Sequence, residues 1–535
     1  MAFLVAALLA LGLALGLSTP AMDYDAAQYA AIAMEMLQRG EWLEVYERGV
    51  PYLDKPPLVF WTAAASYAVF GVSDWAYKLP SLLALAVAIW GTGRLAAVVS
   101  GDDETARLAR WTLASSIAAM LMVSDPRTDT LLMAGVAVAT WQWAEWVRRP
   151  VLRHLVLGAL AAGIAMLAKG PIGLVAPGVA VGVDVLVHRR WRVLWTPSVL
   201  LVPVVILLVL SPMLLGLWRE FGSRGLEFFF WTQSFGRVTG ASEWKNDTSP
   251  LYFTHTFLWT FLPWAPVVLW RLGRMLRAPR NAMWRDEALA VGGFLLLVAA
   301  ISSSRYKLPH YIYVALPFAA VLAARQLRDV GAAIARGWRV GLPALGLLVV
   351  LVAVGLRAAA FGGVPWWGWA MLAGVALLLI QVHRVAEPAW RHVFLTAGLM
   401  AAGMLAVNSL AAPKIFSYQV ETAAGARIRE AGVPEGRFVA LNVHLPSLDF
   451  AARRIVPNVP TAPELAPWLT ADGGPLWVFA RSADEAAVVA LAGRAEPVAR
   501  FDKFGVSRMN GRFLNPATRP RTTEPWVLLK LWPRT

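Results

Sequence analysis

The sequence of 535 residues contains no cysteine. That absence excludes disulfide bonds, thiol catalysis and cysteine-ligated metals, but it leaves an export-side location open. Charged residues are also scarce, because they make up 16% of the chain whereas 58% of its residues are hydrophobic. A soluble domain has about 25% charged residues, and the mean hydropathy here is +0.55. The composition therefore indicates an integral membrane protein.

The formal charge of +15 is not evidence for nucleic-acid binding. In a protein with many spans, basic loops first reflect topology and contacts with anionic lipid headgroups. The 26 tryptophans fit a membrane protein, because the amphipathic indole ring is favoured at membrane interfaces. We expect membrane lipids, and not nucleic acid, to surround this chain.

Apolar segments recur along the first 412 residues. The first, Ala2–Leu17, is followed by small residues, as in a cleaved signal peptide, but neither Lys nor Arg precedes it and many spans follow. We therefore expect a retained first helix. With the later segments it predicts about thirteen transmembrane helices, since a span needs ~20 residues. The later segments lie at about 80–99, 110–123, 130–147, 153–168, 172–188, 193–217, 251–270, 287–303, 311–325, 339–357, 364–382 and 393–412.

Arginines are concentrated in alternate connections between these segments. Because positive charge stays on the cytoplasmic side, the N-terminus is predicted to be cytoplasmic and the protein to be a multi-pass protein of the bacterial inner membrane. The intervening connections then face the periplasm. They comprise Asp23–Trp61, 124–129, 218–250, 302–310 and everything after Ala412.

Two domains are expected. The predicted membrane domain covers 1–412, with an external catalytic loop at 21–79 and an interfacial connection at 218–250, where an aromatic run favours a helix lying in the interface. Residues 413–535 are typical of a small periplasmic α/β domain. Its expected elements are strands at 437–443, 475–480 and 524–532 and a helix at 482–493.

The external loop begins with two aspartates, Asp23 and Asp25, ahead of a predicted interfacial helix, Ala26–Gln38. Capping of that helix accounts for one aspartate better than for two. A carboxylate at the membrane surface can also act as a general base toward a hydroxyl or bind a cation. One face of the helix is predicted to be buried by residues with i, i+3, i+4, i+7 spacing, namely Tyr29, Ile32, Ala33 and Met36.

The same loop continues as Tyr52-Leu53-Asp54-Lys55-Pro56-Pro57. The two prolines stiffen the backbone before an apolar stretch. A lysine held there suits a phosphate oxygen, although a lysine that extends to the interface from an apolar surface is an equally good interpretation.

Further cations and acids stand at other predicted outer boundaries. Two aspartates flank Arg127 in the short turn that ends at Asp129, and Lys169 ends another segment. Taken together, outward cations with aromatics favour a lipid-phosphate pocket over a water-soluble ligand. The candidate phosphate or donor contacts are Tyr52, Lys55, Arg127, Lys169, Arg237, Lys245, Lys307 and Tyr311.

A divalent cation (Zn²⁺, Mg²⁺ or Mn²⁺) is a weaker possibility. Asp54 and His255 are both predicted to lie outside, and carboxylate and imidazole are common metal ligands. A lone histidine is more often structural than a ligand, so the residues leave the metal open.

The order of these motifs resembles a known family. DxDAxxYAxIAxEM and YLDKPPLxFW, then RTDT, KGPIGL, FFFWTQSFGR, HTFLWxFLPW and YKLPHY, are similar to bacterial dolichyl-phosphate-mannose protein mannosyltransferase-like proteins, which include the lipid A aminoarabinose transferases. The resemblance covers nearly the whole membrane region. It implies a glycosyltransferase-C fold with thirteen helices and a periplasmic C-terminal domain, a polyprenyl-phosphate sugar donor, and transfer outside the membrane.

The resemblance also implies roles for particular residues. Asp25 takes the place of the catalytic aspartate of the first external loop, and Asp129 is the comparable acid of the second. Lys55 matches a lysine that contacts the lipid phosphate, and Asp54 and His255 match metal ligands. The family usually has Asp-Glu at the first site, whereas Ala26 follows Asp25 here, so Asp23 is a second catalytic candidate.

The predicted function is an inverting transfer of a sugar from polyprenyl (undecaprenyl) phosphate to a lipid A, glycan or protein acceptor on the periplasmic side. The alternative is a multispan lipid or sugar transporter, or flippase. A transporter is less well supported, since transporters place ionisable groups near mid-membrane and often carry paired repeats, neither of which is evident here. A binding or scaffold protein built on an inactive transferase fold is a third option. The sequence indicates neither the sugar nor the acceptor.

Overall fold

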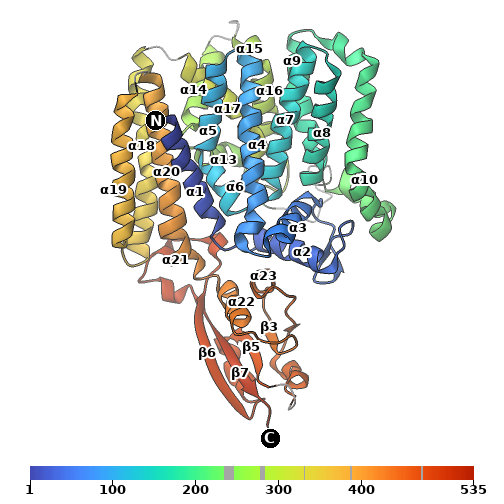
Figure 1. Cartoon of the computed structure of the whole chain (residues 1–535), viewed down its shortest axis with the longest axis vertical. Coiled ribbons are helices and arrows are strands. Elements are labelled where there is room, and N and C mark those ends of the chain that lie inside the picture. The colour runs from blue at the N-terminus through green and yellow to red at the C-terminus, as the bar shows by residue number, and fades with distance from the viewer. Residues whose placement is uncertain are drawn as a thin grey trace.

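The computed structural model of the full chain describes all residues except 234–235, 237–245, 247, 278–282, 330–331, 386–387, 471–473 and 535. A large bundle of helices stands above a smaller unit that is built on a β-sheet (Figure 1). The chain begins toward the far end of the bundle, whereas helices α2 and α3 lie at the end nearest the sheet (Figure 1). The external loop and the C-terminal unit are therefore on one side of the bundle.

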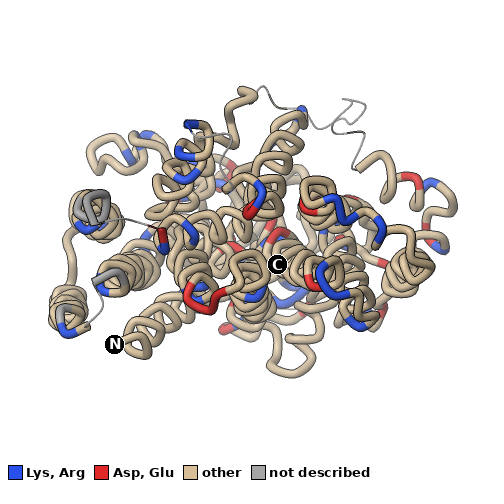
Figure 2. The backbone as a smooth tube through the Cα atoms, turned by 90° about the horizontal axis from the view of Figure 1, so that it is seen from above, with Lys and Arg blue, Asp and Glu red and all other residues tan. Residues whose placement is uncertain are grey.

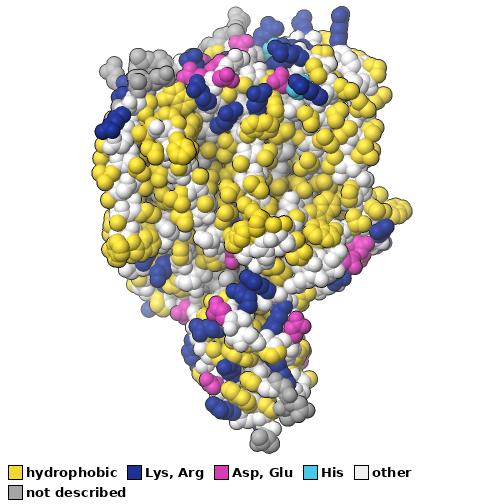
Figure 3. Space-filling model, in the orientation of Figure 1, with side chains coloured by type: hydrophobic (Ala, Val, Ile, Leu, Met, Phe, Trp, Pro, Cys, Tyr) yellow, Lys and Arg dark blue, Asp and Glu magenta, His cyan; other side chains and the backbone are white. Residues whose placement is uncertain are grey.

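On the face seen in Figure 3, apolar side chains form a broad band over the bundle, and Lys and Arg gather above that band and on the sheet unit. Seen along the helices, most of the backbone carries uncharged residues, with short charged stretches between (Figure 2). In the described part of the chain, five helices are long and apolar enough to cross a membrane, and five shorter apolar helices accompany them. This pattern is that of a helical membrane protein.

The helices of the bundle follow the predicted segments closely. They are α1 (Ala2–Leu17), α4 (Asp74–Ser100), α5 (Asp103–Ala114), α6 (Ile117–Ser124), α7 (Thr128–Arg148), α8 (Leu152–Lys169), α9 (Ile172–Val187), α10 (Leu201–Phe221), α13 (Tyr252–Thr260), α14 (Ala265–Arg277), α16 (Ala288–Ser302), α17 (Leu316–Arg328), α18 (Ala332–Gly355), α19 (Trp366–Ile380) and α20 (Pro388–Ala406).

Two predicted spans are broken in the middle. The segment 110–123 splits at Ser115, and 251–270 splits before Pro263, which has no N–H to donate to a helix. The two breaks meet, because the Ile117 N–H donates to the Leu262 carbonyl at 3.1 Å and the Trp264 indole donates to Ser115 Oγ at 3.0 Å. Non-helical backbone inside the bundle is tolerated because these contacts satisfy its polar groups.

The external loop has a small core of its own. Helix α2 (Asp25–Arg39) ends at Gly40, which adopts φ 72°, a left-handed conformation that suits glycine. The four residues predicted to share its inner face are all buried, and burial extends beyond that face to Ala26, Ala27, Ala30, Met34 and Glu35. Helix α3 (Leu58–Phe70) packs against α2. Between them a hairpin of β1 (Tyr46–Glu47) and β2 (Val50–Pro51) turns back on α2.

The C-terminal unit is a five-stranded mixed sheet with the order β4-β3-β5-β7-β6. The three strands predicted from the sequence are present as β3 (Phe438–Leu441), β5 (Leu476–Arg481) and β7 (Glu524–Trp532). The predicted helix at 482–493 shortens to a 3₁₀ turn and α24 (Glu485–Val489). The added elements are β4 (Asn458–Val459), β6 (Arg494–Lys503), α22 (Val420–Glu430) and α23 (Pro446–Ala452).

Strand β6 was not predicted from the sequence, and there is a physical reason for this. It is an edge strand that pairs only with β7, and most of its side chains are exposed or half-buried. Charged residues and Pro497 are tolerated at such an edge, so the strand lacks an apolar pattern. The predicted domain boundary at residue 412 falls within a continuous helical run, because α20 continues through a π-turn into α21 (Ala412–Phe416).

Candidate active site

A polar pocket of about 190 Å³ lies where the external loop meets the ends of the bundle helices. Helix α2 supplies one wall, the turn before α7 and the end of α8 supply a second, and the segment before α17 supplies a third. These parts are far apart in the sequence but all end on the same side of the bundle. The lining residues are Asp25, Gln28, Tyr29, Tyr52, Asp54, Lys55, Arg127, Thr128, Asp129, Lys169, Tyr306, Leu308, His310 and Tyr311.

Asp25 is held by the arginine of the turn before α7. The Arg127 guanidinium pairs with the Asp25 carboxylate and, through Nε at 3.0 Å, with Asp125. Burial disfavours the charge of Arg127, but the two carboxylates raise its pKa above the ordinary value. The Asp25 side chain keeps 36% of its surface exposed. It is therefore oriented by a permanent cation while it still faces the pocket.

A second acid in the pocket is almost fully buried. The Asp129 carboxylate, 1% exposed, accepts from Lys169 Nζ at 2.5 Å and lies 3.7 Å from His310 Nε2. The Lys169 ammonium also stands 3.8 Å from the centre of the Tyr311 ring. Since removing one member of a buried pair leaves an uncompensated charge, this arrangement fixes the wall of the pocket firmly.

The surroundings of His310 favour its neutral form. Burial and the neighbouring cations of Arg127, Lys169 and Lys55 hold the pKa of His310 well below its usual value. A neutral imidazole can donate from one ring nitrogen and accept at the other.

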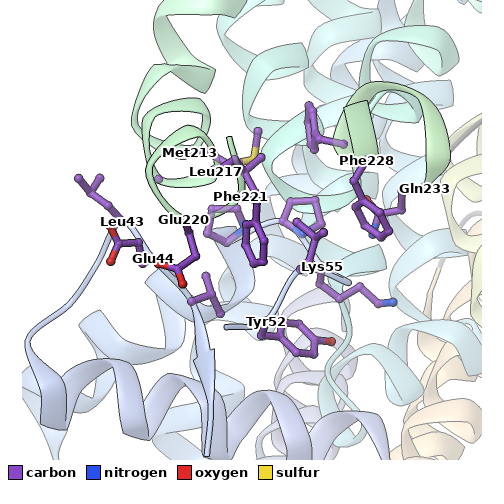
Figure 4. Close-up of a pocket in the computed structure, with 16 residues that line it drawn as sticks. Leu43, Glu44, Tyr52, Lys55, Met213, Leu217, Glu220, Phe221, Phe228 and Gln233 are labelled. Atoms are coloured by element: carbon purple, nitrogen blue, oxygen red, sulfur yellow. The ribbon is translucent and has the colours of Figure 1, made fainter. Parts of the chain in front are cut away.

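Lys55 enters the pocket from the Asp-Lys-Pro-Pro segment. Its ammonium pairs with Asp54, and its side chain is 18% exposed. Tyr52 lies beside it, with its ring edge-on to Phe60 at 5.8 Å. In the close-up the Lys55 nitrogen and the Tyr52 hydroxyl point to the same side, away from Glu44 and Glu220 (Figure 4). Lys55 is thus a cation presented at one edge of the pocket.

Among the described lining residues the charges balance. The three carboxylates of Asp25, Asp54 and Asp129 are each paired with one cation, and the three cations are Lys55, Arg127 and Lys169. The cations that could donate hydrogen bonds to a phosphate are thus already held in place. This reduces the entropy that would be lost by ordering them on binding.

The structure brings together eight of the residues predicted for the site, in this one pocket. They are Asp25, Tyr52, Asp54, Lys55, Arg127, Asp129, Lys169 and Tyr311. Gln28, Tyr306 and His310 line the same pocket but were not predicted. Of these, His310 carried a signal, because it directly precedes Tyr311 in the sequence and stands at the same predicted boundary.

Three predicted residues in the described part of the chain do not line the pocket. Asp23 points to the C-terminal unit, where its carboxylate accepts from the Ser447 hydroxyl. The Lys307 ammonium lies 3.4 Å from the carbonyl oxygen of Thr248. His255 is exposed on α13. Arg237, like Lys245, lies outside the described residues.

A metal site is not formed by the residues that the structure describes. They contain no group of three His, Asp or Glu side chains that could hold an ion, and His255 is not among the residues that line the pocket with Asp54. The assignment of Asp54 and His255 as metal ligands stays a prediction.

A narrow, mainly apolar slot of about 30 Å³ adjoins the polar pocket. It lies between α10 and the 43–57 segment of the external loop, and Tyr52 and Lys55 line both cavities. Figure 4 shows Met213, Leu217 and Phe221 of α10 facing the loop residues across the slot. Lys55 and Tyr52 thus stand where a polar cavity meets an apolar one.

Gly216 allows α10 to approach the external loop, and this gives a testable prediction. A Cβ at this position would overlap the carbonyl oxygen of Leu43, which is backbone and has little room to move. Gly216→Ala should therefore push the 43–57 segment away and raise the Kd of an amphiphilic phosphate probe about tenfold, the effect of ~1.4 kcal/mol. Equilibrium binding in detergent would measure it.

The matched control is Gly178→Ala in α9, where a Cβ would have no neighbour within 4 Å. That variant should keep the wild-type Kd. An unchanged Kd in Gly216→Ala would show that the slot takes no part in binding such a probe.

Comparison with known proteins follows this geometry. Residues 54–216 match the family described as dolichyl-phosphate-mannose-protein mannosyltransferase. The structure aligns with the crystal structure of ArnT from Cupriavidus metallidurans bound to undecaprenyl phosphate, with a TM-score of 0.73, 21% identity and coverage of 98% of this chain and 97% of ArnT. The chain has the glycosyltransferase-C fold. The resemblance predicted from the sequence is confirmed.

The curated relatives that match this chain are named as transferases that act on undecaprenyl phosphate-linked aminoarabinose. An undecaprenyl phosphate-alpha-4-amino-4-deoxy-L-arabinose arabinosyl transferase of Edwardsiella ictaluri is 28% identical over 367 residues, which is 64% of this chain and 61% of that protein. The transferase of the same name from Serratia proteamaculans is 26% identical over 58% of this chain and 56% of its own length. The chain thus matches a little over half the length of these relatives.

Proposed function

We propose that this protein is a glycosyltransferase that moves a sugar from undecaprenyl phosphate, or a similar polyprenyl phosphate, to a lipid A acceptor. One observation carries the proposal: Lys55 stands where a polar pocket joins an apolar slot. An amphiphilic phosphate needs a cation at that junction, and hydrogen bonds between ammonium and phosphate are among the strong ones. The fold shared with ArnT and the names of the curated relatives support this assignment.

The donor phosphate would bind at Lys55 and Tyr52, with the sugar in the polar pocket between Asp25 and Asp129. The apolar slot marks the side on which the polyprenyl chain leaves toward the membrane. Arg127 and Lys169 hold the two carboxylates in place, which positions the reacting groups before the donor arrives.

Transfer would be a single displacement. An acceptor oxygen attacks the anomeric carbon, the bond from that carbon to the phosphate oxygen breaks, and polyprenyl phosphate leaves with the electron pair. A hydroxyl acceptor passes its proton to the Asp25 carboxylate, whereas a phosphate acceptor is already anionic and needs only positioning. One displacement without a covalent intermediate inverts the configuration of the sugar.

A groove on the bundle surface supports a lipid acceptor. It has a volume of about 590 Å³ and is lined almost entirely by apolar residues of α3, α4, α7 and α8. Its wall on α7 begins at Leu131, two residues after Asp129 of the polar pocket. A lipid whose acyl chain lies there would have its headgroup close to Asp25 and Asp129.

The proposal includes the topology predicted from the sequence. The protein would span the bacterial inner membrane about thirteen times, with the N-terminus in the cytoplasm. The catalytic loop and the domain at 413–535 would then face the periplasm. Support comes from the positions of α2, α3 and the sheet, which lie at the end of the bundle opposite the chain start (Figure 1).

Mass spectrometry of lipid A, glycans and exported proteins from cells with and without the protein tests the proposal. We expect lipid A to gain the mass of one sugar only when the protein is present. A mass gain on glycans or proteins would assign a different acceptor, and unchanged spectra in all three fractions would contradict the function.

A further inference from the structure

Helix α23 of the C-terminal unit is buried between that unit and the catalytic loop. All seven of its residues are buried. Leu448 and Ala452 pack into the core of the C-terminal unit beside α22, whereas Phe450 belongs to the apolar cluster of the external loop. A short helix that shares side chains with two cores joins them mechanically.

The first contact reaches the chain just before Asp25. The Gln419 side chain, which precedes α22, donates to the carbonyl of Ala21 at 2.8 Å and accepts from the backbone N–H of Asp23 at 3.0 Å. The Ser447 hydroxyl of α23 donates to the Asp23 carboxylate. The C-terminal unit thus holds both the backbone and the side chain of Asp23, two residues before Asp25.

The second contact reaches the hairpin of the loop. Arg48 adopts φ 55° at the hairpin turn, and its guanidinium pairs with Asp449 and donates to the Val456 carbonyl at 2.8 Å. The backbone N–H of Gly49 beside it donates to Glu35 of α2 at 2.8 Å. The pair Arg48–Asp449 therefore connects α23 to α2 through the hairpin.

The third contact leads to the other acid-bearing turn. The Phe450 ring stacks with Tyr67 at 6.1 Å and meets Tyr77 edge-on at 6.3 Å. The Tyr77 hydroxyl, in turn, donates to the Pro126 carbonyl at 3.2 Å. Pro126 directly precedes Arg127, the partner of Asp25.

We propose that α23 is a positioning element for catalysis, which holds the Asp25 segment through Ser447 and the Arg127 turn through Phe450 and Tyr77. The role rests on the proposed sugar transfer, and it gives the C-terminal unit a function in that reaction. None of these residues of α23 lines the polar pocket, so they act through Asp25 and Arg127.

The two carboxyl groups of this interface have unusual proton affinities. Burial raises the pKa of Asp23 to about 6, with Glu421 adding to the effect and Ser447 and Lys503 opposing it. Burial also raises the pKa of Asp449 to about 6, although Arg48 opposes it and Glu35 adds to it.

The assembled interface therefore holds these two protons more tightly than the separated parts. Its stabilising effect is fully present below the ordinary carboxyl pKa of 3.8, declines above it and is lost as the pH rises through about 6. We expect the thermal unfolding midpoint of the full-length protein to fall from about pH 5 to pH 7, and Asp449→Asn to reduce that fall. Asp484→Asn, in a half-exposed pair with Arg481 on the same unit, should keep the wild-type dependence.

The test of positioning uses three variants of the full-length protein in lipid. Phe450→Leu keeps an apolar side chain but removes the ring, and Ser447→Ala removes one hydroxyl and is the milder change. Val488→Ala is the matched control, because Val488 is buried in the cluster on the other face of the sheet. Each is assayed for kcat and for KM of the donor, and by hydrogen–deuterium exchange of the 18–31 and 124–131 segments.

We expect Phe450→Leu to lower kcat roughly tenfold, since a small misplacement of reacting groups has effects of this size or larger. KM for the donor should change less than about twofold, and exchange should quicken in both segments. Tyr77→Phe should lower kcat by a smaller factor in the Phe450→Leu background than in wild type. Both substitutions break the same connection, which runs from Phe450 through Tyr77 to the Arg127 turn. Val488→Ala should leave kcat and both segments unchanged.

Equal losses in Val488→Ala would show a general stability effect and overturn the proposal. Wild-type kcat in both Phe450→Leu and Ser447→Ala would overturn it as well, even with faster exchange. If the wild-type protein transfers no sugar, the proposed function fails by itself, and exchange still decides whether α23 holds the loop.

Discussion

Asp25→Asn is expected to lower kcat about 10²- to 10⁴-fold with a hydroxyl acceptor, which is the usual contribution of a general base. Asparagine has nearly the same shape but cannot take the proton. The fold should survive, because Arg127 keeps its second partner, Asp125, at 3.0 Å. Donor binding should stay within about twofold of wild type, since Lys55 is untouched. Single-turnover assays with a labelled donor separate binding from transfer.

The acceptor changes the size of this effect. With a phosphate acceptor no proton has to be removed, so a loss below about tenfold would assign Asp25 a positioning role. Asp103→Asn is the control, because Asp103 is exposed in the first turn of α5, away from the pocket. Full activity in Asp25→Asn with both acceptors would remove Asp25 from the mechanism.

Lys55→Ala is expected to raise the donor Kd roughly 10- to 100-fold, since a hydrogen bond to a charged group contributes ~1.5–3 kcal/mol. The charge partner left behind, Asp54, is 30% exposed and can be solvated, so the variant should fold. The donor Kd of Lys55→Arg should lie between those of the wild type and Lys55→Ala, because arginine keeps the charge but changes the geometry. Equilibrium binding of a polyprenyl phosphate measures the effect.

A lysine on the C-terminal unit provides the matched control. Lys530 stands over the Trp477 ring at 4.4 Å, remote from the pocket, so Lys530→Ala should keep the wild-type Kd. If Lys55→Ala bound polyprenyl phosphate as tightly as wild type, the phosphate site would have to lie elsewhere.

The sequence was sufficient to predict eight of the residues that line the polar pocket. Four of them, Lys55, Arg127, Lys169 and Tyr311, each lie close to one end of an apolar segment. In a bundle, ends that share one side of the membrane are neighbours, whatever their separation along the chain. The face of α2 was predictable for a similar reason, since a 3.6-residue period depends only on local spacing.

The direction of individual loop side chains was not predictable. Asp23 and Asp25 are two residues apart, yet Asp23 meets Ser447 whereas Asp25 meets Arg127. Likewise, Lys307 is held by backbone contacts with Asn246 rather than in the pocket. These choices depend on partners about 60 to more than 400 positions away, which local spacing does not reveal.

The most direct measurement of the central claim is the stoichiometry of transfer in reconstituted vesicles. The purified protein is mixed with an undecaprenyl-phosphate sugar and lipid A, and both products are quantified by mass spectrometry. The account predicts equal amounts of free undecaprenyl phosphate and glycosylated lipid A, and smaller but still equal amounts of both products with Asp25→Asn or with Lys55→Ala at low donor concentration. Donor that crosses the bilayer intact, without release of undecaprenyl phosphate, would contradict it and identify a transporter.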